Sequence, residues 1–130
     1  MANEPKKEST LFCVGSGKIL TARIETPAGV TATQAAITSL TVVAKDHTGT
    51  VIGSTALDKT AVIFDTVQGS SLSDSRWRKD VTGYNFRWEL PASWLTAASP
   101  GVRVGLMTDF ASGENQYGEW YGPVQDIVTT

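Results

Sequence analysis

The sequence contains one histidine and one cysteine, the two residue types on which many catalytic and metal sites depend. His47 lies in the run Asp46-His47-Thr48-Gly49, which is typical of a tight turn because Asp and Gly favour sharp reversals. A Ser-His-Asp triad would have to use His47, but no serine stands in a G-x-S-x-G nucleophile elbow. A structural zinc site takes about four ligands, so Cys13 and His47 are too few. We expect no metal site here and interpret Cys13 as a small buried hydrophobic residue.

The acidic side chains are scattered along the chain rather than gathered into a motif. No D-x-D-x-D-G calcium loop and no G-x-x-x-x-G-K-[ST] phosphate loop is present. Calcium held by loops at one end of the fold is the alternative, because its ligands can come from distant positions. Asp109 and Glu119 could act as a glycosidase pair only if folding brings their carboxyl groups close together. We therefore expect no catalytic residue, no cofactor and no enzymatic activity.

Aromatic residues are concentrated in the second half of the chain. Most of the four Trp, three Tyr and four Phe residues occur from Trp77 onward and must fill the core. Neighbours on a strand face opposite sides, so one member of the Trp120-Tyr121 pair is expected outside. Exposed rings can stack on sugars or anchor an interface. The candidate partner or glycan contacts are Trp77, Arg78, Trp94, Tyr117, Trp120 and Tyr121.

Length and charge narrow the class of protein. The 130 residues fit one domain with a core of its own. With 11 Lys and Arg against 13 Asp and Glu, the chain has no basic field that would attract nucleic acid or an anionic membrane. No apolar run approaches the roughly 20 residues of a membrane-spanning helix. A single cysteine excludes an internal disulfide, and the start MANEPKKEST lacks the apolar segment of a signal peptide, so we expect a protein made and kept in a cytoplasm.

The run Tyr84–Leu90 is the strongest strand signal in the chain. Its alternation predicts a buried, mostly aromatic face made of Tyr84, Phe86, Trp88 and Leu90. The opposite, polar face is then made of Asn85, Arg87 and Glu89. A polar loop over residues 68–80 precedes this strand, and the proline that follows it predicts a single helical turn near residues 91–97.

Further strands are predicted where alternating or β-branched runs are bounded by turn residues, at residues 11–14, 18–26, 37–46, 50–54, 61–67 and 102–110. The last strand runs from Tyr117 to about Val128, and its two glycines and Pro123 predict a bend or bulge. Because proline is confined to edges and bulges, Pro123 predicts that this segment lies at an edge or a bulge, and at an edge the strand would be open to a partner. Residues 1–10 are polar and predict an arm that docks on its own domain or on a partner.

About seven short strands at intervals of roughly 8–12 residues, with one helical turn, predict an all-β protein. The expected fold is an immunoglobulin-like antiparallel β-sandwich, with a small barrel as the alternative. The helical turn between two long strands favours the sandwich, because such folds often cross between sheets on a turn of this kind. The predicted organisation is an arm over residues 1–10 followed by a single sandwich domain over residues 11–130.

Several segments resemble small Ig-like proteins encoded among the structural genes of tailed phages and prophages. They are Ile63–Gln68, Trp77, Asp80–Arg87, Pro91–Ser93 and, more loosely, Leu20–Ile24 with the Pro-Ala-Gly turn after it. The resemblance covers roughly residues 18–95 and does not extend to residues 112–130. It implies an architecture and a setting, namely a non-enzymatic subunit that packs against other subunits of a virion.

From this resemblance we expect a virion structural protein of a tailed phage, in the neck, the tail or the capsid surface, made in the host cytoplasm. Its expected partners are other virion subunits and, by symmetry, copies of itself, without nucleic acid or membrane. The alternative is a carbohydrate-binding module that uses Trp77, Trp94 or Trp120 as a stacking platform.

Overall fold

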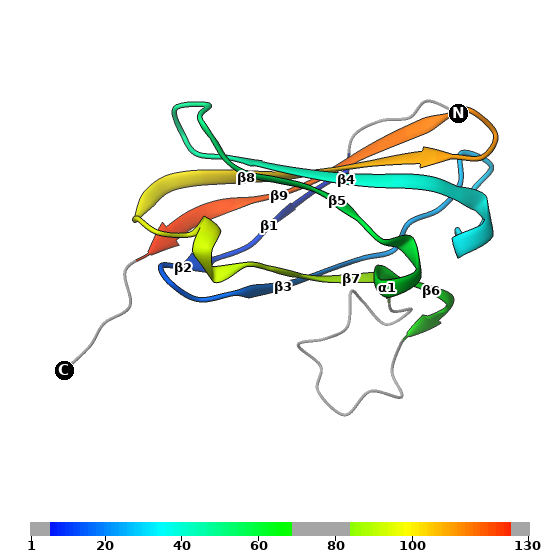
Figure 1. The fold of residues 1–130 in the computed structure, drawn as a ribbon, viewed down its shortest axis with the longest axis horizontal. Helices are drawn as coiled ribbons and strands as arrows, with labels where there is room; N and C mark the ends of the chain where they lie inside the picture. The colour runs from blue at the N-terminus through cyan, green and yellow to red at the C-terminus, as the bar shows by residue number, and fades with distance from the viewer. Residues whose placement is uncertain (1–5, 69–83, 126–130) are drawn as a thin grey trace.

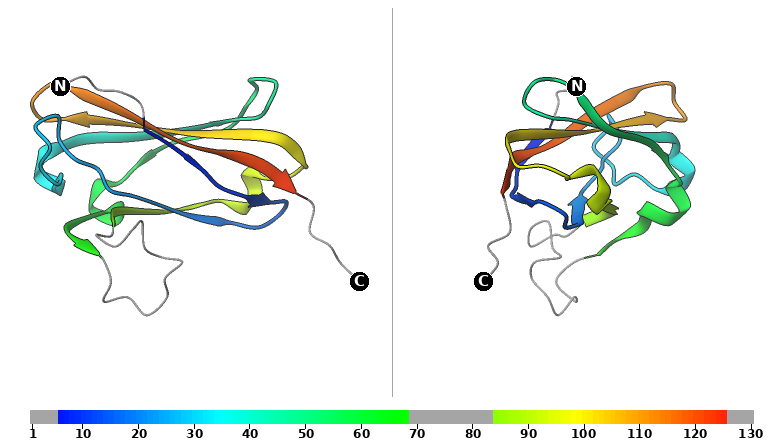
Figure 2. Two further views of the ribbon diagram at one scale, coloured as in Figure 1. Left: turned by 180° about the vertical axis from the view of Figure 1, so that it is seen from behind. Right: turned by 60° about the vertical axis from the view of Figure 1, so that its left-hand side comes forward.

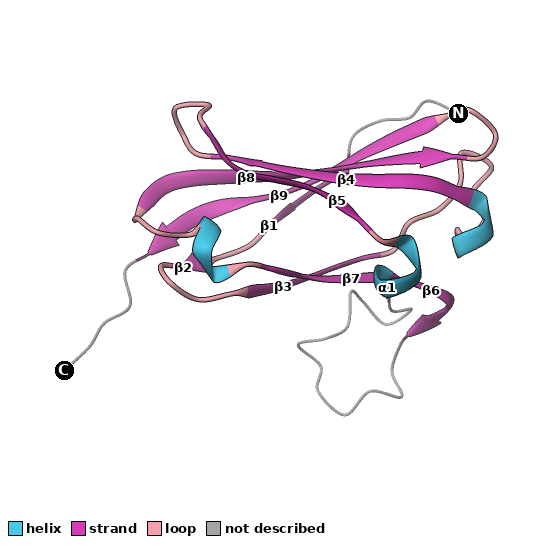
Figure 3. Ribbon diagram, in the orientation of Figure 1, coloured by secondary structure: helices cyan, strands magenta, loops and turns pink. Residues whose placement is uncertain are grey.

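The computed structural model describes residues 6–68 and 84–125 of the chain (Figure 1). Strands predominate, and the short helices lie at strand ends rather than over the face of a sheet (Figure 3). The strands are β1 (Lys6–Ser9), β2 (Phe12–Cys13), β3 (Lys18–Ala22), β4 (Ile37–Lys45), β5 (Val51–Leu57), β6 (Ile63–Gln68), β7 (Tyr84–Leu90), β8 (Ser99–Phe110) and β9 (Asn115–Gln125). The helices are η1 (Gln34–Ala36), α1 (Lys59–Val62) and η3 (Ala92–Trp94).

The described strands form two sheets that pack face to face (Figures 1 and 2). The large sheet has the order β1-β9-β8-β4-β5, with β2 also paired to β9, and the small sheet has the order β3-β7-β6. From β3 onward all pairings are antiparallel, and the chain crosses repeatedly from one sheet to the other. This arrangement is that of immunoglobulin-like sandwiches. The predicted fold class is therefore confirmed.

The core lies between the two sheets and follows the predicted alternation. In β4, the side chains of Leu40, Val42 and Ala44 are fully buried. In β8, the buried residues are Val102, Val104, Leu106, Thr108 and Phe110, besides Gly105. Burial of one such leucine or phenylalanine contributes about 1.5–3 kcal/mol relative to full exposure. The alternation of these two neighbouring strands places their apolar side chains in the core. The burial of these side chains supplies much of the free energy that holds the two sheets together.

Asn85 corrects the predicted face of β7. Its side chain, expected outside, is fully buried and makes three hydrogen bonds. Oδ1 accepts from Ile24 N at 2.6 Å, while Nδ2 donates to Ile24 O and Ala32 O, both at 2.9 Å. The pairing of β3 with β7 ends at Ala22 opposite Phe86, just before Asn85 is reached. The amide therefore continues the hydrogen bonding between these two chain segments after the backbone ladder ends.

The N-terminal segment docks on its own domain. β1 and β2 both run parallel to β9, with Lys6 opposite Gly118 and Phe12 opposite Val124. Between them, Thr10 N donates to Tyr121 O at 2.8 Å. The backbone of Thr10 occupies the space that a Cβ at Gly122 would need, so only glycine lets the segment approach so closely. These two parallel strands add to the antiparallel sandwich that the sequence predicts.

Of the two places predicted for Pro123, an edge or a bulge, the structure shows the bulge, and the last strand is not an open edge. β9 is paired with β8 on one side and with β1 and β2 on the other. Its predicted bulge is present, because the register between β8 and β9 shifts between the pairs Ser99–Val124 and Val102–Gly122. Pro123 lies at this shift, so the proline marks a bulge rather than an edge.

Three local predictions also differ from the structure. Residues 61 and 62 belong to α1 rather than to a strand, because the Asp58 carboxylate accepts from N and Oγ1 of Thr60, at 2.9 and 2.7 Å, and so caps a helical turn. Cys13 is half-buried, whereas Phe12 beside it is fully buried. The helical turn near residues 91–97 is confirmed as η3, but Pro91 caps it instead of starting it. Of the predicted loop over residues 68–80, residues 69–80 lie outside the described residues.

We expect Asn85→Ala to lower the free energy of unfolding by about 2–4 kcal/mol, because three hydrogen bonds to buried backbone groups are lost. Asn85→Asp keeps an acceptor for Ile24 N but sets an oxygen against two carbonyl groups, so it should also destabilise the fold. Chemical denaturation followed by tryptophan fluorescence measures both effects. Glu89→Ala, at an exposed position of the same strand, is the control and should change stability by less than about 0.5 kcal/mol. A loss below about 1 kcal/mol in Asn85→Ala would contradict the role of the amide.

Candidate functional site

The six predicted contact residues have different surroundings. Trp77 and Arg78 lie outside the described residues. Trp94 lies in η3, and Tyr117, Trp120 and Tyr121 lie on β9.

Trp120 is a core residue, which corrects its prediction as a contact. Its side chain is 4% exposed, and its ring stacks on Phe86 with 5.8 Å between ring centroids and 25° between planes. The indole Nε1 donates to Thr21 O at 3.3 Å, so the polar atom of the ring is also engaged inside the protein. Tyr121 is 42% exposed and faces the other way. The expectation that one member of this pair lies outside is thus confirmed.

Trp94 is half-buried and serves to pack the sandwich. Its ring meets Trp88 edge-on, with 5.6 Å between centroids and 60° between planes. The same ring also lies against Gly53 of β5, where it fills the space that a Cβ at this position would occupy. Any larger residue at position 53 would displace the indole from this place. Trp94 therefore closes the gap between η3 and the edge of the large sheet rather than presenting a free ring face.

Tyr117 belongs to a hydrogen-bonded cluster on the outer face of the large sheet. Glu119 Oε1 accepts from Nε and Nη2 of Arg103, at 3.2 and 3.0 Å, and from the Tyr117 hydroxyl at 3.1 Å. The Tyr117 ring covers Gly105, where a Cβ would collide with it. The side chain of Glu119 is 4% exposed, whereas that of Arg103 is 62% exposed. The carboxylate is thus buried beneath the cation that neutralises it.

This cluster shifts the pKa values of two of its members. Burial raises the pKa of Tyr117, and the hydrogen bond to the Glu119 carboxylate raises it further. The same carboxylate raises the pKa of the Arg103 guanidinium by hydrogen bonding and by its charge. Both groups are therefore held in the proton-bearing form in which they donate to Glu119.

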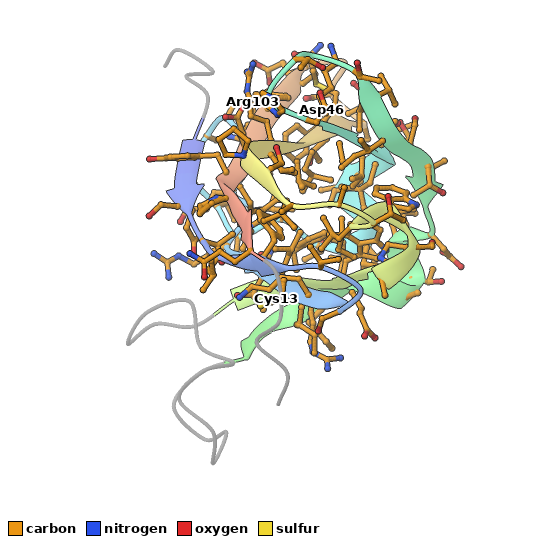
Figure 4. All side chains as sticks on the ribbon, turned by 90° about the vertical axis from the view of Figure 1, so that its left-hand side faces the viewer. Cys13, Asp46 and Arg103 are labelled. Atoms are coloured by element: carbon orange, nitrogen blue, oxygen red, sulfur yellow. The ribbon has the colours of Figure 1, made fainter. Side chains whose placement is uncertain are left out.

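A groove of about 620 Å³ lies at the end of the large sheet where β4 turns into β5. Figure 4 looks onto this end, with Arg103 and Asp46 beside each other and Cys13 apart from both. The groove walls carry basic, acidic, aromatic and hydroxyl groups: Ser9, Thr10, Lys45, Asp46, His47, Thr48, Arg103 and Tyr121, with Pro100 and Pro123 among the rest. A second hollow of about 290 Å³ over Gly105 shares Lys45 and Arg103 with it. This end of the outer face is the best candidate for a binding site in the described part of the chain.

His47 lines this groove but is not arranged as a catalytic base. Its Nδ1 lies 2.9 Å from Ser99 Oγ, and that hydroxyl donates to Gly101 O at 3.0 Å. Which of the two groups donates depends on the tautomer of the imidazole, but no carboxylate of the described residues bonds to His47 as the third member of a triad would. Oδ1 of Asp46 accepts from N and Oγ1 of Thr48, and these bonds, led by the hydroxyl, lower the pKa of the carboxyl group. The residues of a triad are thus present here without its hydrogen-bonding order.

The carboxylates that the sequence left open as a glycosidase pair lie far apart on the outer face. Glu119 is opposite Gly105 and Asp109 is opposite Asn115, so four residues of β8 separate the two positions. At about 3.3 Å per residue this corresponds to about 13 Å, beyond the 5–9.5 Å at which such pairs work. Among the described residues, no group of three or more His, Cys, Asp or Glu side chains is placed to hold a metal ion.

Sequence reasoning missed Lys45 and Arg103 as groove residues. Both stand at outward positions of strands that the alternation predicts well. Their meeting depends on the register of β4 against β8, which places Lys45 opposite Arg103. No local pattern encodes that register.

No protein-family model matches this chain, and no curated protein matches it. Of the described helices, none has the length and apolar character needed to cross a membrane.

Stability should fall at alkaline pH through Tyr117. Since its pKa is raised above the usual value of 10.0, the folded protein holds this proton more tightly than the unfolded chain does. The resulting stabilisation is complete below about pH 10 and is lost as the pH rises through the raised value. The difference in unfolding free energy between the wild type and Tyr117→Phe should therefore shrink as the pH rises above about 10.

Denaturant unfolding at several pH values measures this difference. Tyr121→Phe, which removes an exposed hydroxyl from the same strand, is the matched control. A difference between wild type and Tyr117→Phe that stays constant with pH would contradict the raised pKa of Tyr117.

Proposed function

We propose that this chain is a non-enzymatic structural subunit of a tailed-phage virion that acts by packing against neighbouring subunits. The virion setting, in the neck, the tail or the capsid surface, rests on the resemblance of residues 18–95 to small Ig-like phage proteins. Its partners are other virion subunits and copies of itself, and it is made in the host cytoplasm. The observation that carries the assembly role is the open edge strand β5.

The two sheets have four edge strands, β1 and β5 in the large sheet and β3 and β6 in the small one. These edges differ in the features that prevent pairing with another chain. Natural sheet edges are protected by charged residues, proline, bulges or short length. β1 carries two lysines and a glutamate, β3 carries Lys18, and β6 carries Asp65. β5 has the sequence VIGSTAL, seven residues with neither charge nor proline. Among the described edges, β5 is the one that its sequence leaves free to accept a strand.

The two faces of β5 are prepared differently for such a contact. Towards the core, Trp94 packs on Gly53 and fixes this part of the strand. Towards solvent, Ser54 and Ala56 are exposed, and Val51 is 52% exposed. Strand addition uses backbone N–H and C=O groups for affinity and the flanking side chains for specificity. A rigid, uncharged edge with small exposed side chains meets both requirements.

The carbohydrate-binding alternative loses support in the form that relied on tryptophan. Trp120 is buried and Trp94 packs on Trp88 and Gly53, so neither offers a free ring face. Trp77, the third platform, lies outside the described residues.

Lysines at Ser54 and Ala56 should prevent assembly through β5. Two charges on the edge have to be desolvated when a neighbouring strand pairs with it, which is how natural edges avoid association. We expect the wild-type chain to form oligomers or to join purified particles, and the double variant to remain monomeric. Native mass spectrometry and mass spectrometry of purified particles measure these two outcomes.

Ser16→Lys is the matched control, because Ser16 is exposed in a turn outside the two sheets. It should assemble as the wild type does, and unchanged thermal unfolding of all variants shows that the fold is intact. Assembly that is unaffected by the two lysines would refute the edge contact. Absence of the chain from purified particles would refute the virion role.

A further inference from the structure

Four residues from four strands form a continuous row across the outer face of the large sheet. Lys45 of β4 lies opposite Arg103 of β8, Arg103 lies opposite Tyr121 of β9, and Tyr121 lies opposite Ser9 of β1. Directly opposed residues project from the same face of a sheet. At about 4.8 Å between strands, the row from Lys45 to Tyr121 spans about 10 Å. All four residues line the 620 Å³ groove.

The row itself carries two cationic side chains. Lys45 is exposed and has no ion pair within the described residues, and the Arg103 side chain is 62% exposed. Glu119, the carboxylate paired with Arg103, is 4% exposed. Asp46 is engaged by the backbone and hydroxyl groups of its own turn. Two like charges directly opposed across strands destabilise a sheet, and an anion bound between them would remove that repulsion.

Arg103 retains donors for such an anion. A guanidinium has five N–H donors in a planar fork, and the two bonds to Glu119 use Nε and Nη2. A carboxylate of a ligand can therefore approach Arg103 from the exposed side and form an ion pair with Lys45 at the same time. Glu119 fixes the orientation of the fork from below, so the site is pre-organised before a ligand arrives.

Tyr121 adds an aromatic face next to the cations. It is 42% exposed, and its hydroxyl makes no hydrogen bond within the described residues. Its neighbours in the groove include the hydroxyl groups of Ser9 and Thr48 and the imidazole of His47. An exposed ring flanked by hydrogen-bonding groups suits a ligand with both an apolar face and several hydroxyl groups.

We propose that this groove binds an acidic saccharide. One sugar ring stacks on Tyr121, and its carboxylate lies between Arg103 and Lys45. A sugar acid carries a C–H face, hydroxyl groups and a carboxylate within one or two rings, which matches the order of groups along the 10 Å row. A neutral sugar would leave Lys45 without a counter-ion and the outer donors of Arg103 unused, and an acidic peptide side chain would not use the aromatic face. The proposal goes beyond the assembly role and stands whether or not the chain assembles through β5.

The test is an NMR titration of the intact chain with glucuronate, galacturonate and sialic acid, and with glucose and galactose as neutral counterparts. We expect millimolar binding of at least one acid, with amide shifts around Lys45, Arg103 and Tyr121, and at least about tenfold weaker binding of the neutral sugars. Tyr121→Ala and Lys45→Gln should each weaken the binding of that acid by about tenfold.

Lys18→Gln, the same change on the other sheet, is the matched control and should leave the affinity unchanged. Both groove positions are exposed, and an unchanged amide spectrum elsewhere shows that the variants fold. Absence of shifts with all three acids at millimolar concentration overturns the proposal. Equal affinity for acidic and neutral sugars, or full affinity in Tyr121→Ala, overturns it as well.

Discussion

The side-chain amide of Asn85 joins two parts of the chain that the backbone ladders leave separate. The backbone of Ile24 is bonded to Ala32 N, which closes a small loop between β3 and β4, and Asn85 binds both ends of that loop. Ile24 and Ala32 are core residues, 5% and 0% exposed. A buried amide is tolerated in such a place only when its hydrogen-bonding groups are satisfied. The amide therefore fixes both the path of the loop and the position of β7 in the small sheet.

The same constraint reaches the outer face through one aromatic contact. Phe86 follows Asn85 on β7 and stacks on Trp120 of β9. With Trp120 held inward by this stack and by its bond to Thr21, its neighbours Glu119 and Tyr121 must face outward. The burial of a single tryptophan thus sets which face of β9 carries the cluster around Arg103 and the exposed ring of Tyr121. The side chains of β9 that pack in the core and those that line the candidate groove therefore project from opposite faces of the same strand.

Much of the fold could be predicted because period-two alternation in β4, β7 and β8 matches burial directly. The burial of Asn85 was not predicted, because the alternation pattern assigns a polar residue to the outer face. Whether a polar side chain can be buried depends on hydrogen-bond partners that only the folded structure brings near it. The parallel docking of β1 escaped because its polar side chains carry no pattern, and its pairing is made by backbone groups. The groove was only half predictable, since Tyr121 could be singled out on its strand but its neighbours Arg103 and Lys45 follow from interstrand register.

The open edge and the groove are compatible because one is an edge of the sheet and the other is its face. A strand added beside β5 would lie about 4.8 Å beyond it, in the plane of the sheet, and would leave the outer face uncovered. Val51 lies opposite Lys45, so β5 already extends the row of groove residues by one position. A neighbouring subunit paired to β5 would extend this row again, with its own side chains beside Val51. Assembly through the edge would therefore leave the groove open to its ligand.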